Sequence, residues 1–247
     1  MTGLVEVSGL GTSAVVDLGE EIDPAVFRTA WSRCLGAGPN AVKSVERPGR
    51  VIGPEPLMTS LTQVITRDLI GRRAGELLML HAGAVCNTAT GATVAYAAPG
   101  GTGKTTLTRR LGRTFGYVTD ETVGVEPGTW RVHPYPKPLS VRDSDADWPK
   151  SEHGPDSLGL LAVHPAPQLS ALLILRRDPA VTSPIWSRLD LFDAITTLSP
   201  ETSSLSRLDR PLHLLEDLHR ALDGFWLVEY AEAEQIADRV GAMVEDS

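Results

Sequence analysis

The sequence predicts an α/β fold built around a phosphate-binding loop. Short apolar runs, typical of buried strands, alternate with patterns of helical spacing over much of the chain. A glycine-rich segment at residues 98–105 separates one of these runs from one of these helices. The 247 residues are enough for one large α/β domain with a small appendage. We expect an N-terminal accessory α+β segment over residues 1–75 and a P-loop domain over residues 76–247, together in one compact unit.

The N-terminal segment is predicted to combine strands and helices. Its expected elements are two short strands within residues 4–18, a helix over about 23–34, an edge strand within 40–56 and a helix over about 56–73. A turn at Gly9-Leu10-Gly11 separates the two strands. Asp23 is typical of an N-cap and Pro24 of a first helical position, so the first helix has a defined start.

The second segment alternates strands and helices. Apolar runs predict strands over residues 77–85, 92–98, 115–121, 123–125, 130–132, 139–141, 170–177 and 225–230, and helical patterns predict helices over 104–111, 188–198, 211–222 and 233–244. The polar residues 143–157 predict a loop of the kind that often covers an active site.

The glycine-rich segment fits the P-loop pattern. Residues 98–105 read Ala-Pro-Gly-Gly-Thr-Gly-Lys-Thr, with alanine at the first position, where glycine is commoner. Its three glycines let backbone N–H groups turn inward around phosphates. Lys104 can reach the β- and γ-phosphates, the Thr105 hydroxyl can ligate Mg²⁺, and the following helix directs its positive N-terminus at the anion. The predicted nucleotide-binding residues are Pro99, Gly100, Gly101, Thr102, Gly103, Lys104, Thr105 and Thr106.

An acid pair ends the predicted strand after the P-loop helix. Asp120 and Glu121 stand where the carboxyl ends of strands line the ligand crevice in sheets of this type. An acid at this place can hold Mg²⁺ or take a proton from an attacking hydroxyl. The alternative is that both are solvated acids after a strand. We expect Thr105, Asp120 and Glu121 to form the metal site.

The composition argues against some partners. The formal net charge is −8 and the pI is near 5.3, so nucleic acids and anionic membranes, which need a basic face, are not expected partners. The longest apolar stretches are too short to span a bilayer, and the N-terminus lacks the basic start of a signal peptide. Cys34 and Cys86 match no metal-binding spacing and predict reduced, buried thiols. We expect a cytoplasmic protein.

The order of the motifs resembles that of a known family. A His81-Ala-Gly-Ala-Val run is followed by a turn, a strand, the P-loop and the acid pair. This order resembles the catalytic domain of HPr kinase/phosphorylase, and it is most similar to the shorter HPr-kinase-like proteins that include lasso-peptide precursor kinases. The resemblance covers about residues 77–142. It implies a P-loop kinase domain of the HPr kinase and phosphoenolpyruvate carboxykinase type, with a small N-terminal accessory layer.

The resemblance also implies roles for individual residues. Lys104 and Thr105 fall on the phosphate and Mg²⁺ residues, and Asp120 falls on the catalytic acid that accepts the serine proton. Glu121 falls on the metal-associated acid, where the family has aspartate. From the pattern alone, His81 is more often a strand-end histidine with a structural hydrogen bond, but it falls on the active-site histidine beside the phosphates. The catalytic candidates are therefore Asp120, His81 and Lys104.

Basic residues further along the chain are candidates for contacts with phosphate or an acidic substrate. Lys137 and Arg142 belong to a Pro-rich stretch that resembles one in the short relatives. Arg176 and Arg177 end the predicted strand 170–177, where one of them could stabilise charge on a transferred phosphoryl group. A solvated pair at a strand end is the alternative.

Three functions fit these motifs. The first is a kinase that uses ATP and Mg²⁺ to phosphorylate a hydroxyl, with a serine of a peptide or protein as the expected acceptor. The second is an ATPase or GTPase switch in which Asp120 and Glu121 form a Walker-B-like pair and water is the nucleophile. The third is an inactive nucleotide-binding scaffold. Of the three, we expect the kinase. Full-length members of the family that this chain resembles are oligomers, so the resemblance also allows for a homo-oligomer.

Overall fold

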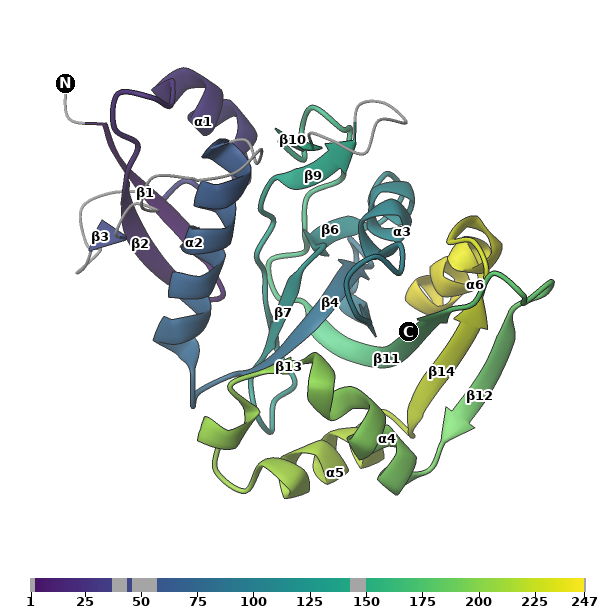
Figure 1. Ribbon diagram of the computed structural model, residues 1–247. Helices are drawn as coiled ribbons and strands as arrows, with labels where there is room; N and C mark the ends of the chain where they lie inside the picture. The colour runs from purple at the N-terminus through teal and green to yellow at the C-terminus, as the bar shows by residue number, and fades with distance from the viewer. Residues whose placement is uncertain (1–2, 37–43, 46–56, 143–149, 247) are drawn as a thin grey trace. The chain divides into compact units, whose positions relative to one another are not determined.

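The computed structural model describes residues 3–36, 44–45, 57–142 and 150–246 (Figure 1). The chain divides into two units. The first unit comprises Met1–Arg73 and Tyr135–Gly159, and the second comprises Ala74–Pro134 and Leu160–Ser247. The expected division after residue 75 put residues 135–159 in the P-loop domain, whereas the described residues of this range, 135–142 and 150–159, belong to the first unit.

The first unit holds a small sheet and two helices. Its described elements are β1 (Leu4–Gly9), β2 (Thr12–Asp17), α1 (Pro24–Ala30), the 3₁₀ helix η1 (Ser32–Cys34), β3 (Ser44–Val45), α2 (Leu57–Arg73), β9 (Leu139–Arg142) and β10 (Lys150–His153). Strands β1 and β2 form an antiparallel hairpin, and β3 pairs with β2 in parallel. Leu10 and Gly11 form the two-residue turn between β1 and β2, and both have positive φ, as a type I′ hairpin turn requires. The other residues of the expected edge strand within 40–56 lie outside the described residues.

An aromatic cluster explains why residues 135–159 join the first unit. Trp31 stacks on Phe27 with ring centroids 5.4 Å apart, and the Tyr135 ring lies 6.3 Å from Trp31. The Tyr135 hydroxyl bonds the Thr66 hydroxyl of α2 at 2.9 Å. A Cβ atom at Gly9 would lie 2.2 Å from the Tyr135 ring, so glycine is needed for this approach. Residues 135–159 are polar and contain several prolines, so the sequence gives no apolar pattern that would predict this packing.

The second unit is built on a mixed nine-stranded sheet with the order β12-β14-β11-β5-β4-β7-β8, in which β6 and β13 also pair with β4. The strands are β4 (Leu78–Cys86), β5 (Ala92–Ala97), β6 (Gly116–Thr119), β7 (Thr122–Val125), β8 (Val132–His133), β11 (Gln168–Arg177), β12 (Ile185–Leu189), β13 (Thr202–Ser203) and β14 (Phe225–Tyr230). The helices are α3 (Lys104–Leu111), α4 (Leu191–Leu198), η2 (Ser199–Glu201), η3 (Leu205–Arg207), α5 (Pro211–Ala221) and α6 (Glu234–Glu245). The mixed α/β fold that the sequence predicts is confirmed.

Helices cover both faces of this sheet (Figure 1). On one face, Leu198 of α4 and Leu215 of α5 pack in a core with Leu172 of β11. On the other face, Leu107 of α3 and Val240 of α6 pack in a core that includes the next strand residue, Leu173. Because successive side chains of a strand point to opposite faces, burial on both faces explains the nearly continuous apolar runs of β4, β5 and β11.

Four predicted boundaries are corrected by the structure. The expected strand 115–121 ends at Thr119 as β6, so the acid pair lies in the bend before β7, which corresponds to the expected strand 123–125. The expected helix 188–198 begins only at Leu191, where the Asp190 carboxylate caps it by accepting from the N–H of Asp193 at 2.9 Å. Residues 150–153 of the expected loop form β10, while 143–149 lie outside the described residues. The helix expected over 23–34 ends at Ala30 and continues as η1.

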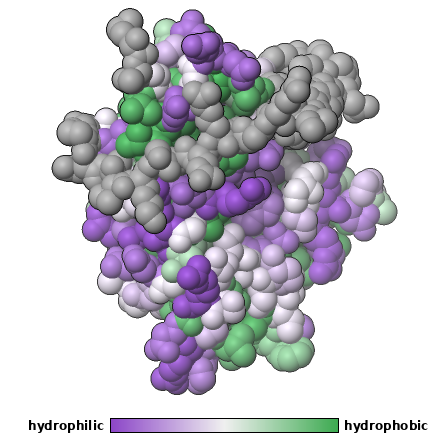
Figure 2. All heavy atoms as spheres, turned by 60° about the vertical axis from the view of Figure 1, so that its left-hand side comes forward, coloured by the Kyte–Doolittle hydropathy of each residue, from purple (hydrophilic) through white to green (hydrophobic). Residues whose placement is uncertain are grey.

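One face of the molecule shows how polar and apolar residues are distributed (Figure 2). Hydrophilic residues predominate on the face drawn in Figure 2, with smaller hydrophobic areas between them. Large hydrophobic side chains are exposed at Leu4, Val26, Leu161, Ile185, Phe192 and Leu212. None of the helices in the described ranges has the length and hydropathy that a bilayer crossing requires. Cys34 and Cys86 are free and buried, as predicted.

Candidate functional site

The glycine-rich loop, residues 98–105, connects β5 to α3. Gly103 is the N-cap of α3 and has φ 99°, and Gly101 has φ 85°, which are conformations that side chains disfavour. The Thr102 hydroxyl closes the loop by donating to the Pro99 carbonyl at 2.8 Å. A Cβ atom at Gly100 or Gly101 would meet no heavy atom within 4 Å, so open space lies beside both residues. This space and the N–H groups at the start of α3 suit an anion.

Lys104 is the first residue of α3, and its side chain is buried. Its ammonium group donates to the carbonyls of Ala98 and Pro99, at 3.0 Å for Pro99. Burial lowers the pKa of Lys104, and the negative charges of Glu201, Asp120 and Glu121 oppose this effect. The ammonium group therefore lies in a setting where anions stabilise its charged form.

Asp120 is buried and contacts the loop. Its Oδ2 atom accepts a hydrogen bond from the Thr105 hydroxyl at 2.9 Å, and its Oδ1 atom accepts from the Tyr117 hydroxyl at 3.3 Å. The topology brings these residues together because β5 and β6 both run antiparallel to β4 and therefore parallel to each other. Their carboxyl ends lie at the same edge of the sheet, as the sequence argument assumed.

Glu121 follows in the bend between β6 and β7. Its N–H donates to the Thr119 hydroxyl at 3.3 Å, and its carbonyl accepts from the N–H of Ala82 at 3.0 Å. Thr122 also donates through its N–H to Thr119 at 3.4 Å. The bend is thus held by the Thr119 hydroxyl and by one backbone contact with β4, and it keeps two carboxylates adjacent at the end of β6.

His81 of β4 lies next to the loop and bonds an acid that sequence reasoning missed. Its Nδ1 atom is 3.1 Å from Oε2 of Glu201, and the carbonyl of His81 accepts from the N–H of Ala98 at 3.3 Å. Glu201 ends η2, far from the acid pair in the sequence, and among the three acids that raise the pKa of Lys104 its negative charge acts most strongly. A Ser-Pro-Glu turn after a helix carries no signal of a functional site, so only the fold reveals Glu201.

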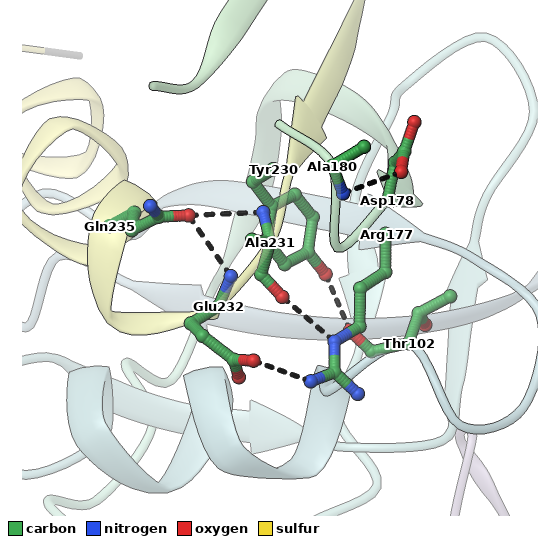
Figure 3. A network of polar contacts seen from close by, with 8 residues as sticks. All are labelled: Thr102, Arg177, Asp178, Ala180, Tyr230, Ala231, Glu232 and Gln235. Carbon is green, nitrogen blue, oxygen red and sulfur yellow. Dashed lines mark hydrogen bonds and ion pairs between the residues drawn. The ribbon is translucent and has the colours of Figure 1, made fainter. Parts of the chain in front are cut away.

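A second missed residue, Tyr230, holds the loop from the side of β14 (Figure 3). Its hydroxyl donates to the Thr102 carbonyl at 2.6 Å. Burial raises the pKa of Tyr230 to about 12, and the charge of Glu232 acts in the same direction while Arg177 opposes it. The phenol therefore stays protonated and remains a donor at neutral pH.

The same network engages one of the predicted arginines (Figure 3). Arg177 donates through Nε to the Ala231 carbonyl at 2.8 Å and pairs with Glu232 at 2.7 Å. The side-chain amide oxygen Oε1 of Gln235 accepts from the N–H groups of Ala231 and Glu232, each at 3.0 Å. Arg177 thus orders the turn that follows Tyr230.

The structure shows an ion pair for Arg176, a hydrogen bond for Lys137 and a position at a strand end for Arg142. Arg176 pairs with Glu229 of β14 at 3.1 Å. Lys137 is buried in the first unit and donates to the Pro138 carbonyl at 3.0 Å, and Arg142 ends β9 of that unit. Contacts of Lys137, Arg142 and Arg176 with phosphate or substrate stay predictions.

The residues of the loop fit a magnesium nucleotide. The open space at Gly100 and Gly101 can admit phosphate oxygens, and Thr105 and Asp120 offer the oxygen ligands that Mg²⁺ prefers. Within the described residues, no group of three or more His, Cys, Asp or Glu side chains is placed to hold a metal ion. Mg²⁺ is usually bound by one or two carboxylates together with substrate phosphates, so this donor set is sufficient.

Comparisons with known proteins give a distant likeness to solved structures. No family model and no curated protein matches the chain. Among solved structures, the chain is similar to the Hpr(Ser) kinase/phosphatase from Coxiella burnetii, with a TM-score of 0.36 and 10% sequence identity over 68% of this chain and 94% of that chain. A likeness at this level is too distant to identify a reaction or a substrate.

Proposed function

We propose that this protein is a kinase that uses ATP and Mg²⁺ to phosphorylate a hydroxyl group, with a serine of a peptide or protein as the acceptor. The observation that carries the proposal is the contact of Thr105 with Asp120 at the end of the glycine-rich loop. It puts a buried carboxylate next to the hydroxyl that ligates Mg²⁺ in P-loop enzymes. The serine acceptor rests on the resemblance of the motif order to HPr-kinase-like proteins.

The site residues divide into those that bind and those that act on the hydroxyl. The loop N–H groups and Lys104 would hold the β- and γ-phosphates, while Thr105 and Asp120 would hold Mg²⁺. The metal ion, when bound, would neutralise charge that develops on the phosphates during transfer. Two side chains of the site, Asp120 and His81, could accept the hydroxyl proton. Such a site accelerates phosphoryl transfer mainly by positioning and charge stabilisation.

The same contact also supports a second candidate, a nucleotide hydrolase. In P-loop ATPases and GTPases, an acid at the end of a neighbouring strand holds Mg²⁺ together with the loop Ser or Thr. Asp120 and Thr105 have this arrangement, and Glu121 would then be available to orient water. The two functions differ in whether a hydroxyl acceptor or water receives the phosphoryl group.

Transfer of labelled phosphate separates the two. The purified protein is incubated with Mg²⁺, γ-labelled ATP and a serine-containing peptide library, and the products are identified by mass spectrometry. We expect label on a serine hydroxyl, no label on matched peptides with alanine, and no transfer by Asp120→Asn. Free phosphate formed at the same rate without any acceptor would support the hydrolase instead.

The affinity for the nucleotide tells which role Asp120 has. If Asp120 holds the metal ion, Asp120→Asn weakens binding of Mg·ATP, measured by calorimetry, while binding of ATP in EDTA is unchanged. If Asp120 only accepts the proton, the variant binds Mg·ATP as well as the wild type does. Asp217→Asn is the matched control, because it makes the same change at an exposed acid of α5 that pairs with Arg220 and leaves the contact of Asp120 with Thr105 in place.

A further inference from the structure

Glu201 is held opposite His81 by the backbone of the sheet. In the antiparallel pairing of β13 with β4, Thr202 lies opposite Leu80 and Ser203 opposite Met79. The residue before Thr202 therefore falls opposite the residue after Leu80, which pairs Glu201 with His81. The Thr202 hydroxyl also donates to the Ser199 carbonyl at 2.7 Å and fixes the turn of η2. The pair is thus a consequence of strand register.

The contact determines which ring nitrogen of His81 carries hydrogen. The side chain of Glu201 is 12% exposed, and its Oε2 atom lies 3.1 Å from Nδ1. An ionised carboxylate only accepts hydrogen bonds, so Nδ1 must carry the hydrogen. In neutral imidazole the other nitrogen is then an acceptor. Among the described residues, Nε2 of His81 has no hydrogen-bond partner, and the side chain is 41% exposed, so this nitrogen is open to a ligand.

The arrangement separates proton transfer from metal binding. Asp120 already accepts from Thr105 and Tyr117, and its position suits the metal ion. His81 lies beside the first residue of the loop and is free at Nε2. A carboxylate on Nδ1–H holds an imidazole in the tautomer that can accept a proton, and it stabilises the imidazolium that forms.

We propose that Glu201 is a positioning residue that holds His81 with hydrogen on Nδ1, and that Nε2 of His81 accepts the proton of the acceptor hydroxyl. The hydroxyl oxygen forms a bond to the γ-phosphorus while its proton passes to Nε2. The bond from that phosphorus to the bridging oxygen breaks, and this oxygen leaves with the electron pair as part of the nucleoside diphosphate. The assignment of the proton rests on the proposed kinase function, whereas the tautomer does not.

The tautomer is measured by long-range ¹H–¹⁵N NMR of the full-length protein without nucleotide or acceptor. We expect a protonated Nδ1 in the wild type. Glu201→Ala should shift the neutral ring to the form with hydrogen on Nε2, and Glu201→Gln, which keeps an acceptor oxygen, should retain Nδ1–H. A wild-type ring that is neutral with hydrogen on Nε2 would overturn the inference whether or not the protein is a kinase.

The kinetic test is a double-mutant cycle on phosphate transfer. His81→Ala should lower kcat by about 10²-fold or more, as loss of a general base does. Glu201→Ala should lower kcat by about 10- to 100-fold, as loss of an orienting partner does. Glu201→Gln should recover part of the rate, and Glu201→Ala should have no further effect in the His81→Ala protein.

The controls separate this inference from the proposed function. Glu216→Ala, which removes an exposed carboxylate paired with Arg220 on α5, should leave kcat unchanged. Equal losses from Glu201→Ala in the wild type and in His81→Ala would show that Glu201 does not act through His81. If the wild type transfers no phosphate at all, the kinase proposal fails, and the NMR result alone then decides whether Glu201 orients His81.

Discussion

Gly103 and Gly100 of the loop differ in their backbone conformation. Substituting each one therefore tests a different property, the stability of the fold for Gly103 and nucleotide binding for Gly100. Gly103 needs a positive φ of 99°, whereas Gly100 has no positive φ and open space where a Cβ would be. Gly103→Ala should therefore lower the free energy of unfolding by about 1–3 kcal/mol, because alanine is strained in that conformation. Gly100→Ala should change it by less than about 0.5 kcal/mol.

Nucleotide binding should rank these variants differently. An alanine side chain at residue 100 occupies the space that we assign to phosphate oxygens, so Gly100→Ala should weaken binding of Mg·ATP although the fold stays intact. Urea unfolding and calorimetric titration of both variants check the two expectations. A Gly100→Ala protein that binds Mg·ATP like the wild type would show that phosphate does not use this space.

At this scale, sequence reasoning identified the residues of contiguous motifs and missed those that the fold supplies. Lys104 and Thr105 follow from the glycine-rich pattern, and the strand–loop–helix order gave a physical reason to expect Asp120 nearby. Glu201 and Tyr230 come from distant segments, and each reaches the site through strand pairing. Such pairings depend on register between strands, which no local pattern of residue types encodes.

At the scale of elements, helix α3 is fastened to β5 through a chain of hydroxyl groups. The Thr108 hydroxyl donates to the Lys104 carbonyl at 2.9 Å, so it accepts from the Tyr96 hydroxyl. Gly83 of the neighbouring strand makes room for this pair, because a Cβ there would lie 2.3 Å from the Tyr96 ring and 2.6 Å from the Thr108 hydroxyl. The position of α3, and with it the loop, therefore depends on a glycine in β4.

Gly83→Ala should disturb this fastening. We expect a loss of about 1–3 kcal/mol in the free energy of unfolding, since the added methyl group forces Tyr96 and Thr108 apart in a packed core. Gly71→Ala in α2 is the control, because a Cβ there meets nothing within 4 Å and alanine stabilises a helix by about 0.5–1 kcal/mol relative to glycine. Thermal unfolding of both variants measures the effects, and an unchanged stability of Gly83→Ala would contradict the packing argument.

Elements with a strong apolar pattern were predicted well, and those without one were missed. The buried strands β4, β5 and β11 have long apolar runs, and their predicted ranges agree with the structure. Strand β12 lies at the edge of the sheet and has an exposed Ile185 and Arg188, so it lacks the alternation of a half-buried strand. It pairs with the backbone of β14, and its Trp186 and Arg188 side chains contact the Trp226 ring, which its composition does not reveal.

At the scale of the whole molecule, an ion pair ties the two chain segments of the first unit. Asp156 accepts hydrogen bonds from the Ser32 hydroxyl and from Nε of Arg33 at 2.9 Å, and it pairs with the Arg33 guanidinium at 2.7 Å. The hydrogen bond from Ser32 and the contacts with Arg33 hold the pKa of Asp156 below its usual value, against the effect of burial. The carboxylate therefore stabilises the fold in its ionised form.

The sign of this shift gives a pH dependence. A lowered pKa in the folded state contributes stability above the unfolded pKa of about 3.9, and that stability is lost as the pH falls through the folded pKa. At pH 7, Asp156→Asn should lower the free energy of unfolding by about 0.5–1 kcal/mol, a small effect because the side chain is 58% exposed. Urea unfolding at several pH values should show the two proteins converge in acid, whereas a difference that persists below the folded pKa would exclude this origin.

The discontinuous first unit also has a consequence for biosynthesis. The ribosome completes residues 1–73 long before Tyr135, whose ring fills the space over Gly9 and contacts Trp31. Until Tyr135 has been synthesised, Trp31 and the surface over Gly9 lack this packing partner, while the early strands of the second unit are still being translated. Domains ordinarily fold in the order of their synthesis, but here the unit that begins first needs residues from the middle of the chain. Chaperones that bind exposed aromatic segments would therefore find a binding site within residues 1–73 until Tyr135 has been synthesised.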